Sequence, residues 1–277
     1  MTEELQIRIH GDASLPTLIY LPGLHGDWTL VTSFRLALAG RVRFVEFTYP
    51  RTLTWSLEEY ARAIEAALLE HGITRGWILG ESFGSQIVWP LVGSAREEIR
   101  GAKEQVDENH SFSHHPSHFL PQGIILAGGF GKHPFKWGVR LAGRLGRGVS
   151  LTWLTRLLFF YARFARFRHR HAPETFASIE EFIARRTELD KLAAVHRLRL
   201  IADFDPRSIA AQTTLPLYYL SGLFDPIVPW PLVRPWLRRH CPSYRGRRII
   251  WKADHNVLGT APREAAEQVV AWLSRGQ

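Results

Sequence analysis

The feature that most constrains the fold of this chain is a serine flanked by two glycines. It lies between an apolar segment and a segment with a helical pattern. Residues 80–84 read Gly-Glu-Ser-Phe-Gly, which matches the pattern G-x-S-x-G. The apolar run 76–79 predicts a strand before the pattern, and the segment from about Ser85 predicts a helix after it. At such a strand-to-helix turn the serine hydroxyl is held in a cleft. The context therefore predicts that Ser82 is a nucleophile, and the alternative is a glycine-rich turn that only caps a helix.

Apolar segments of strand length recur along the chain, with helical patterns between them. They predict strands at residues 5–9, 17–21, 42–47, 76–79, 123–127, 217–221 and 248–251. Ser56 is expected to cap a helix that Gly72 ends, and a last helix is expected at about 262–273. Alternation of this kind predicts an α/β fold with a mostly parallel sheet.

The positive charge of the chain is concentrated in one region. The 277 residues carry a net charge of +9, and residues 132–200 alone hold 15 Lys and Arg against 5 Asp and Glu. This basic region contains no convincing strand and lies between two predicted strands. Residues 131–202 are therefore predicted to form a helical cap, inserted into a core of residues 1–130 and 203–277. No nucleic-acid partner is expected, because a uniformly basic nucleic-acid binder would spread its charge differently; binding through one basic face stays open as an alternative.

The composition excludes several other classes of protein. Hydrophobic residues make up 45% and charged residues 22%, which is typical of a folded globular chain and excludes global disorder. Cys241 is the single cysteine and cannot form an internal disulfide. The first residues, Met-Thr-Glu-Glu, lack the basic start of a secretory signal. No uncharged apolar stretch approaches the ~18 residues of a membrane span. A cytoplasmic protein is predicted.

A serine nucleophile needs a base and an acid to activate it. His255 lies between the last predicted strand and the last predicted helix, and it is the candidate base. Asp225 lies in the turn after the preceding strand and is the candidate acid, although it also suits an Asx turn before proline. Asp203 and Asp205 are rivals, but they precede that strand. The order Ser82, Asp225, His255 is typical of one class of catalytic triad.

With these residues the chain resembles the α/β-hydrolase fold superfamily over nearly its full length. The resemblance implies a mostly parallel eight-stranded sheet flanked by helices, with the helical cap over Ser82. It also implies a serine hydrolase of the carboxylesterase type that acts through an acyl-enzyme, with a small acyl compound as substrate and with no metal or organic cofactor. Acyl transfer to another acceptor, or hydrolysis of a thioester or amide, would use the same triad. A non-catalytic protein that binds through the basic cap is the alternative from another class.

The resemblance further implies an oxyanion hole. The loop 21–26 matches the family's oxyanion loop, with Pro22-Gly23 in place of the usual His-Gly pair. In this register the backbone N–H groups of Leu24 and Phe83 bind the oxyanion. His25-Gly26 is the alternative match and would move the first donor to Asp27. Leu24 is favoured because Asp27 suits the cap of the next helix.

Two further regions suggest binding roles. A helix predicted at about 150–171 carries the candidate substrate-binding residues Trp153, Leu157 and Tyr161, and its arginines are either solvated or available to anionic groups. The exposed aromatic residues of this region would suit a homodimer contact, so that a monomer and a homodimer both stay open. The histidines of the second region do not predict a metal site, and a solvated loop is expected there; they are His110, His114, His115 and His118.

Overall fold

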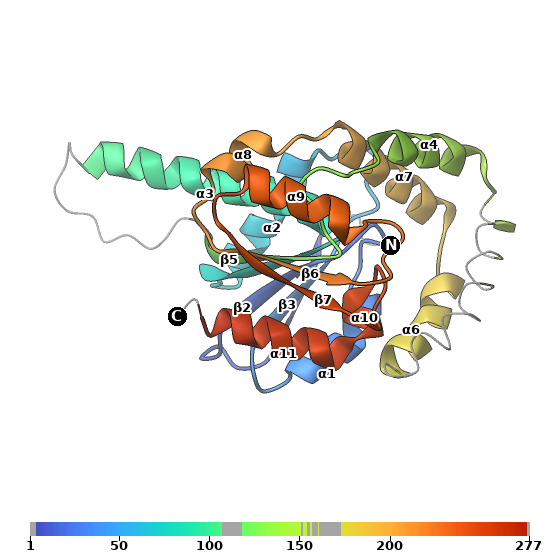
Figure 1. Cartoon of the computed structure of the whole chain (residues 1–277), viewed down its shortest axis with the longest axis horizontal. Coiled ribbons are helices and arrows are strands. Elements are labelled where there is room, and N and C mark those ends of the chain that lie inside the picture. The colour runs from blue at the N-terminus through green and yellow to red at the C-terminus, as the bar shows by residue number, and fades with distance from the viewer. Residues whose placement is uncertain are drawn as a thin grey trace.

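The structure is a computed structural model, and it describes residues 4–106, 118–150, 152–153, 156, 160 and 173–275. Strands and helices alternate along most of these residues (Figure 1). The strands are β1 Gln6–His10, β2 Thr17–Leu21, β3 Arg43–Thr48, β4 Arg75–Glu81, β5 Leu120–Ala127, β6 Leu217–Gly222 and β7 Tyr244–Ile250. The helices are η1 Thr29–Val31, α1 Thr32–Leu38, α2 Leu57–Glu70, α3 Gly84–Val106, α4 Lys136–Gly148, α6 Pro173–Ala184, α7 Glu188–Asp203, α8 Arg207–Gln212, α9 Trp230–His240, α10 Val257–Thr260 and α11 Pro262–Leu273. Within these residues, no helix combines the length and the apolar character that a membrane crossing requires.

The strands form one sheet in the order β1-β3-β2-β4-β5-β6-β7. β1 pairs antiparallel with β3, and every other neighbouring pair is parallel. The predicted mostly parallel sheet is confirmed, and each of the segments predicted as a strand is one. The described residues contain seven strands instead of the eight that the resemblance implies, because their apolar pattern supplies seven segments of strand length.

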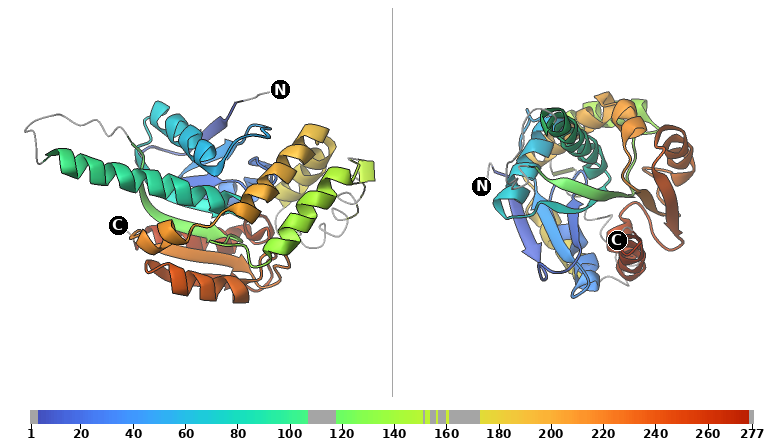
Figure 2. Two further views of the ribbon diagram at one scale, coloured as in Figure 1. Left: turned by 90° about the horizontal axis from the view of Figure 1, so that it is seen from above. Right: turned by 90° about the vertical axis from the view of Figure 1, so that its left-hand side faces the viewer.

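Helices cover both faces of the sheet (Figures 1 and 2). On one face, α1, α10 and α11 enclose a buried apolar cluster that includes Phe34 and Ala265. On the other face, α2, α3, α8 and α9 enclose a second cluster that includes Tyr60. Neighbouring residues of β2 divide between the two clusters, with Ile19 in the second and Tyr20 in the first. This follows from the two-residue period of a strand and explains why the central strands are apolar throughout.

The start of α2 shows how local sequence sets an element's limits. Ser56 Oγ accepts a hydrogen bond from the Glu59 N–H, 3.2 Å away, and Glu59 Oε2 accepts one from the Ser56 N–H, 2.7 Å away. This reciprocal capping box satisfies two backbone donors that the first helical turn leaves free. The helix ends at Glu70, and Gly72 follows with a positive φ of 66°. The cap predicted at Ser56 is thus present.

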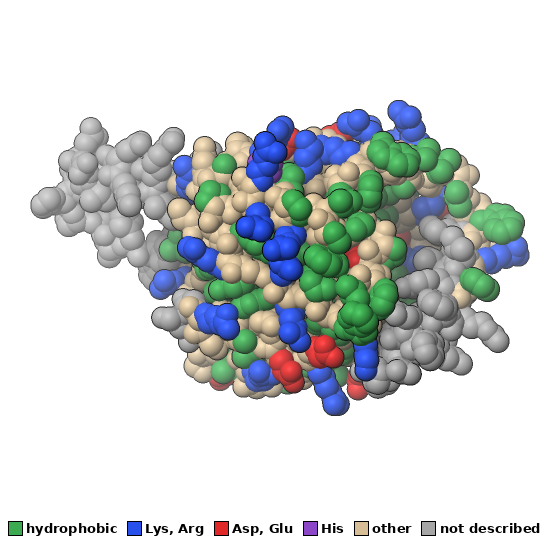
Figure 3. Space-filling model, viewed as in Figure 1, with side chains coloured by type: hydrophobic (Ala, Val, Ile, Leu, Met, Phe, Trp, Pro, Cys, Tyr) green, Lys and Arg blue, Asp and Glu red, His purple; other side chains and the backbone are tan. Residues whose placement is uncertain are grey.

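Between β5 and β6 the chain leaves the sheet and forms α4, α6 and α7, at the right in Figure 1. α4 packs against α7 and exposes Trp137, Leu141 and Leu145 on its outer side. Figure 3 shows apolar and basic side chains gathered over this helix. The division into core and cap at residues 131 and 202 stays a prediction. Most of the helix predicted at 150–171 lies outside the described residues.

Candidate active site

The turn between β4 and α3 holds Ser82 in an unusual backbone conformation. Ser82 has a φ of +46°, the one positive φ of a non-glycine residue in the described part of the chain. A side chain on Gly84 would overlap the carbonyl oxygen of Leu21, and a Cβ on Gly80 would lie 2.7 Å from Val88 Cγ2. Both glycines are therefore required by close packing around the turn. This is the strained strand-to-helix turn that the G-x-S-x-G pattern predicts.

Two hydrogen bonds connect the side chains of Ser82, His255 and Asp225. His255 Nε2 lies 2.9 Å from Ser82 Oγ, and His255 Nδ1 lies 2.9 Å from Asp225 Oδ2. A carboxylate only accepts hydrogen bonds, so Nδ1 carries the proton and Nε2 is left to accept from the serine hydroxyl. The structure thus brings together the three side chains named from the sequence, in the arrangement that a serine nucleophile needs.

Asp225 is fixed by backbone donors as well as by His255. Its Oδ1 accepts hydrogen bonds from the N–H groups of Ile227, at 2.9 Å, and Val228, at 2.8 Å, and the residue is 6% exposed. The carboxylate is therefore held in one orientation. The rival acids lie elsewhere: Asp203 pairs with Arg140 and Asp205 pairs with Lys132.

The loop after β2 lies directly beside Ser82. A Cβ on Gly23 would be 3.3 Å from Ser82 Cβ, and Leu24 lines the same cavity as Ser82. In the described residues, the N–H groups of Leu24 and Phe83 have no hydrogen-bond partner. Asp27 instead lines a neighbouring cavity, and its carboxylate accepts a hydrogen bond from the N–H of Thr29, the first residue of η1. This arrangement favours Leu24 over Asp27 as the first oxyanion donor.

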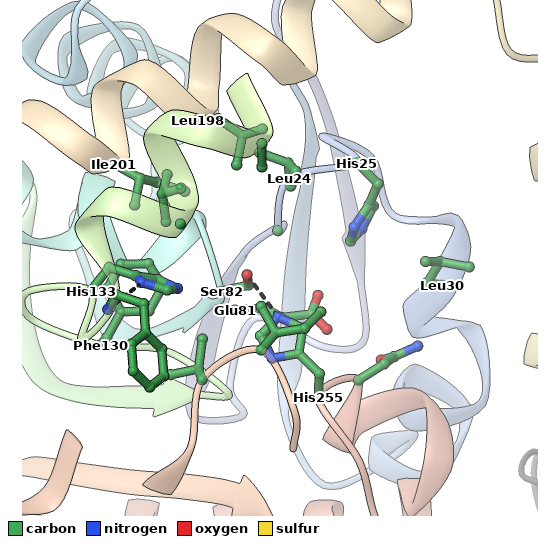
Figure 4. Close-up of a pocket in the computed structure, with 18 residues that line it drawn as sticks. Leu24, His25, Leu30, Glu81, Ser82, Phe130, His133, Leu198, Ile201 and His255 are labelled. Carbon is green, nitrogen blue, oxygen red and sulfur yellow. Dashed lines mark hydrogen bonds between the residues drawn. The ribbon is translucent and has the colours of Figure 1, made fainter. Parts of the chain in front are cut away.

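The Ser82 hydroxyl faces a cavity of about 420 Å³ (Figure 4). Ser82, His255 and Glu81 lie on one side of it, and apolar side chains from the insert face them. The apolar lining residues are Leu24, Leu30, Phe130, Phe135, Val139, Ala142, Leu198, Ile201, Ile227 and Val228. A mostly apolar cavity with a few convergent polar groups is the usual form of a small-molecule site.

No protein-family model and no curated protein sequence matches this chain, whereas solved structures do. A thermophilic esterase from Thermogutta terrifontis matches 98% of this chain and 93% of its own, with a TM-score of 0.70 and 16% identity. An enol-lactonase from Burkholderia xenovorans matches 98% of this chain and 96% of its own, with a TM-score of 0.68 and 16% identity. An esterase from Exiguobacterium antarcticum matches 98% of this chain and 95% of its own, with a TM-score of 0.70 and 13% identity. The chain has the α/β-hydrolase fold. At these identities the likeness concerns the fold alone.

Among the polar side chains that line the cavity of this α/β-hydrolase fold, His133 and Glu81 are two to which the sequence assigns no role. The imidazole of His133 faces the cavity, where Nδ1 accepts a hydrogen bond from the Phe135 N–H at 3.1 Å. Burial, together with the neighbouring His255, lowers the pKa of His133 to about 4, so that it is neutral at pH 7. No local pattern distinguishes His133 from the other histidines. Its position just beyond the carboxyl end of β5 is the signal that points to the site.

Glu81 is the second such side chain, and it precedes the serine. It is 4% exposed and accepts a hydrogen bond from the hydroxyl of Tyr20. Burial and the charge of Glu81 raise the pKa of Tyr20 well above its ordinary value, so that Tyr20 remains a donor. The pair therefore links the turn that holds Ser82 to β2.

The remaining candidates from the sequence are partly described. Trp153 is 68% exposed and lines a second apolar cavity, of about 920 Å³, whose wall also includes Leu24 and Leu198. Leu157 and Tyr161 lie outside the described residues, as do His110, His114 and His115. His118 Nδ1 lies 3.7 Å from Glu65 Oε1. Within the described ranges, no three His, Cys, Asp or Glu side chains are grouped as metal ligands would be.

Proposed function

We propose that this protein hydrolyses carboxylic esters that have an apolar acyl group. The observation that carries the proposal is the hydrogen-bonded series Ser82, His255 and Asp225, which opens into an apolar cavity of about 420 Å³. This volume lies within the ~300–1,000 Å³ of ordinary ligand pockets. The apolar wall suits the acyl chain, and the polar groups are confined to the side where the ester bond would lie.

In the first half of the reaction, Ser82 Oγ attacks the ester carbonyl while His255 Nε2 takes the hydroxyl proton. The carbonyl oxygen becomes an oxyanion, which the N–H groups of Leu24 and Phe83 stabilise. Asp225 keeps the proton on His255 Nδ1 and stabilises the imidazolium. The tetrahedral intermediate then collapses, the imidazolium gives its proton to the departing alkoxide oxygen, and the acyl group stays on Ser82.

In the second half, water replaces the alcohol. His255 Nε2 takes a proton from the water as the water oxygen attacks the acyl carbonyl, and the same N–H groups stabilise the second oxyanion. Collapse releases the carboxylic acid, and His255 returns the proton to Ser82 Oγ. Every proton is exchanged between substrate, water and the three side chains. Acyl transfer to another alcohol or to a thiol would differ only in the second nucleophile.

The first test is covalent labelling of the folded protein with a fluorophosphonate, read by intact mass. We expect one adduct on the wild type and none on Ser82→Ala. Ser14→Ala, which removes an exposed serine hydroxyl in the turn before β2, is the matched control and should label like the wild type. A panel of p-nitrophenyl esters from acetate to laurate then measures the acyl preference. A folded wild type that takes up no label and turns over no ester would favour the binding-protein alternative.

A further inference from the structure

A third cavity lies beside the loop that carries Leu24, and it differs in character from the two apolar cavities. It has a volume of about 250 Å³, and His25 lines both this cavity and the one in front of Ser82. Its wall is polar and strongly basic. The five arginines that line it are Arg8, Arg51, Arg185, Arg186 and Arg197.

Two carboxylates share this cavity and balance only part of the positive charge. Arg186 Nη2 lies 2.6 Å from Asp27 Oδ2, and Arg51 Nε lies 2.6 Å from Asp190 Oδ1. Arg186 also approaches Asp190 Oδ1, at 3.4 Å. Without Arg185, four guanidinium groups of the wall therefore stand against two carboxylates. A concave wall with such an excess of one sign concentrates ions of the opposite sign.

Arg197 adds to this excess from a buried position. It is 3% exposed, and its guanidinium donates to the carbonyl oxygens of Leu24, at 3.0 Å, and Pro50, at 3.2 Å. No carboxylate of the described residues forms an ion pair with it. It reaches these carbonyls because Gly26 has no side chain, and a Cβ there would overlap the guanidinium. A buried cation with neutral partners only is costly, and an anion nearby would offset that cost.

Three buried polar atoms of the lining residues have no hydrogen-bond partner in the described part of the chain. They are Arg186 Nε, His25 Nε2 and Thr48 Oγ1. Buried polar atoms in native proteins are paired with few exceptions, so each such atom calls for a partner. The Arg186 Nε–H and the Thr48 hydroxyl are both donors, and oxygen atoms of an anion are the acceptors that would suit them.

We propose that this cavity binds a phosphate group. Phosphate offers several acceptor oxygens and up to two negative charges near pH 7, which matches both the unpaired donors and the excess of arginine. The volume of the cavity is below the ~300 Å³ at which drug-sized ligand pockets begin, which suits a small group. The phosphate is either the free ion or the phosphate of a monoester. This inference goes beyond the proposed esterase activity and does not depend on it.

Calorimetric titration with inorganic phosphate, at constant ionic strength against a chloride reference, tests the proposal. We expect saturable binding of one phosphate per chain by the wild type. Thr48→Val keeps the shape of the side chain and removes the unpaired hydroxyl, so phosphate should bind about five- to tenfold more weakly. The melting temperature of Thr48→Val without phosphate should not fall, because the lost hydroxyl had no partner.

A second variant tests the charge of the cavity. Arg8→Gln removes one exposed cation from the wall and should weaken phosphate binding about tenfold. Arg238→Gln, in the separate arginine cluster of α9, is the matched control and should bind like the wild type. Glycerol 3-phosphate distinguishes the two sources: tighter binding than inorganic phosphate indicates a monoester, and weaker binding indicates the free ion.

Two results would overturn the proposal. One is a titration of folded wild-type protein in which phosphate gives no saturable heat of binding. The other is binding that Thr48→Val leaves unchanged and that Arg238→Gln weakens as much as Arg8→Gln does, which would mean general attraction to a basic surface. Because the readout is heat of binding, an inactive esterase site would change neither conclusion.

Discussion

Replacing Asp225 by asparagine gives the most direct test of the proposed triad, because the structure dictates how the new amide must lie. Asp225 Oδ1 accepts from the N–H groups of Ile227 and Val228, and Oδ2 accepts from His255. The oxygen of the new side-chain amide would keep the two backbone donors, since its NH₂ group cannot accept from them. The NH₂ group would then face His255 Nδ1.

That orientation reverses the tautomer of the imidazole. Nδ1 would have to accept from the amide, the proton would move to Nε2, and Nε2 would no longer take the proton of Ser82. Loss of the correct tautomer in a serine triad lowers kcat about 10⁴-fold, which corresponds to about 5.5 kcal/mol of activation free energy. The backbone hydrogen bonds survive, so the free energy of unfolding should change by no more than about 2 kcal/mol.

The assay is the kcat of p-nitrophenyl butyrate hydrolysis at pH 7, together with the urea unfolding of each variant. Asp205→Asn is the matched control, because Asp205 pairs with Lys132 and Arg207 away from the site and should change kcat less than about twofold. An Asp225→Asn enzyme that keeps more than a tenth of wild-type kcat would refute the proposed role of Asp225. Equal losses in both variants would do so as well.

Three further changes probe the surroundings of the site. Gly84→Ala places a methyl group against the carbonyl oxygen of Leu21, so the free energy of unfolding should fall by about 3 kcal/mol or more in a urea titration; an unchanged midpoint would contradict the packing described. His133→Asn keeps an acceptor for the Phe135 N–H but does not titrate. The pKa of His133 is about 4 in the folded protein and 6.5 in the unfolded chain, so the free energy of unfolding of the wild type should fall by roughly 3 kcal/mol between pH 6.5 and pH 4. The free energy of unfolding of the variant should fall by less. Equal pH dependence of the two proteins would refute this. Arg197→Met leaves two loop carbonyls without their donor, so kcat should fall about tenfold with a smaller change in KM. Arg197→Lys should restore part of the lost kcat. A change in KM alone would argue against a positioning role.

Local signals predicted much of this fold. Each strand has its own apolar pattern and its own turn residues, so the strands could be located without knowledge of their neighbours. The turn at Ser82 needs two glycines for packing reasons that the pattern itself records. His255 and Asp225 could be named because the carboxyl ends of parallel strands meet at one edge of a sheet, so their places after successive strands implied that they meet.

Features that depend on long-range packing were not predicted. The order β1-β3-β2 and the antiparallel pairing of β1 arise from contacts between segments far apart in sequence. The sequence places His133 in the basic insert, and charge and spacing do not reveal that its imidazole is buried and neutral. The contact of Arg197 with the carbonyl of Leu24 joins residues that are 173 positions apart in the sequence, and no local pattern predicts such a contact.

The separation of Ser82 and His255 along the chain also bears on how the molecule folds. Their hydrogen bond joins residues 173 apart, and His255 is positioned only after β7 has added to β6 at the end of the sheet. Forming such a contact requires a large loop to close, and contacts of this range are slow to form. Regain of turnover during refolding would therefore trail the regain of helical circular dichroism. The return of ester cleavage during refolding would then report when β7 pairs with β6.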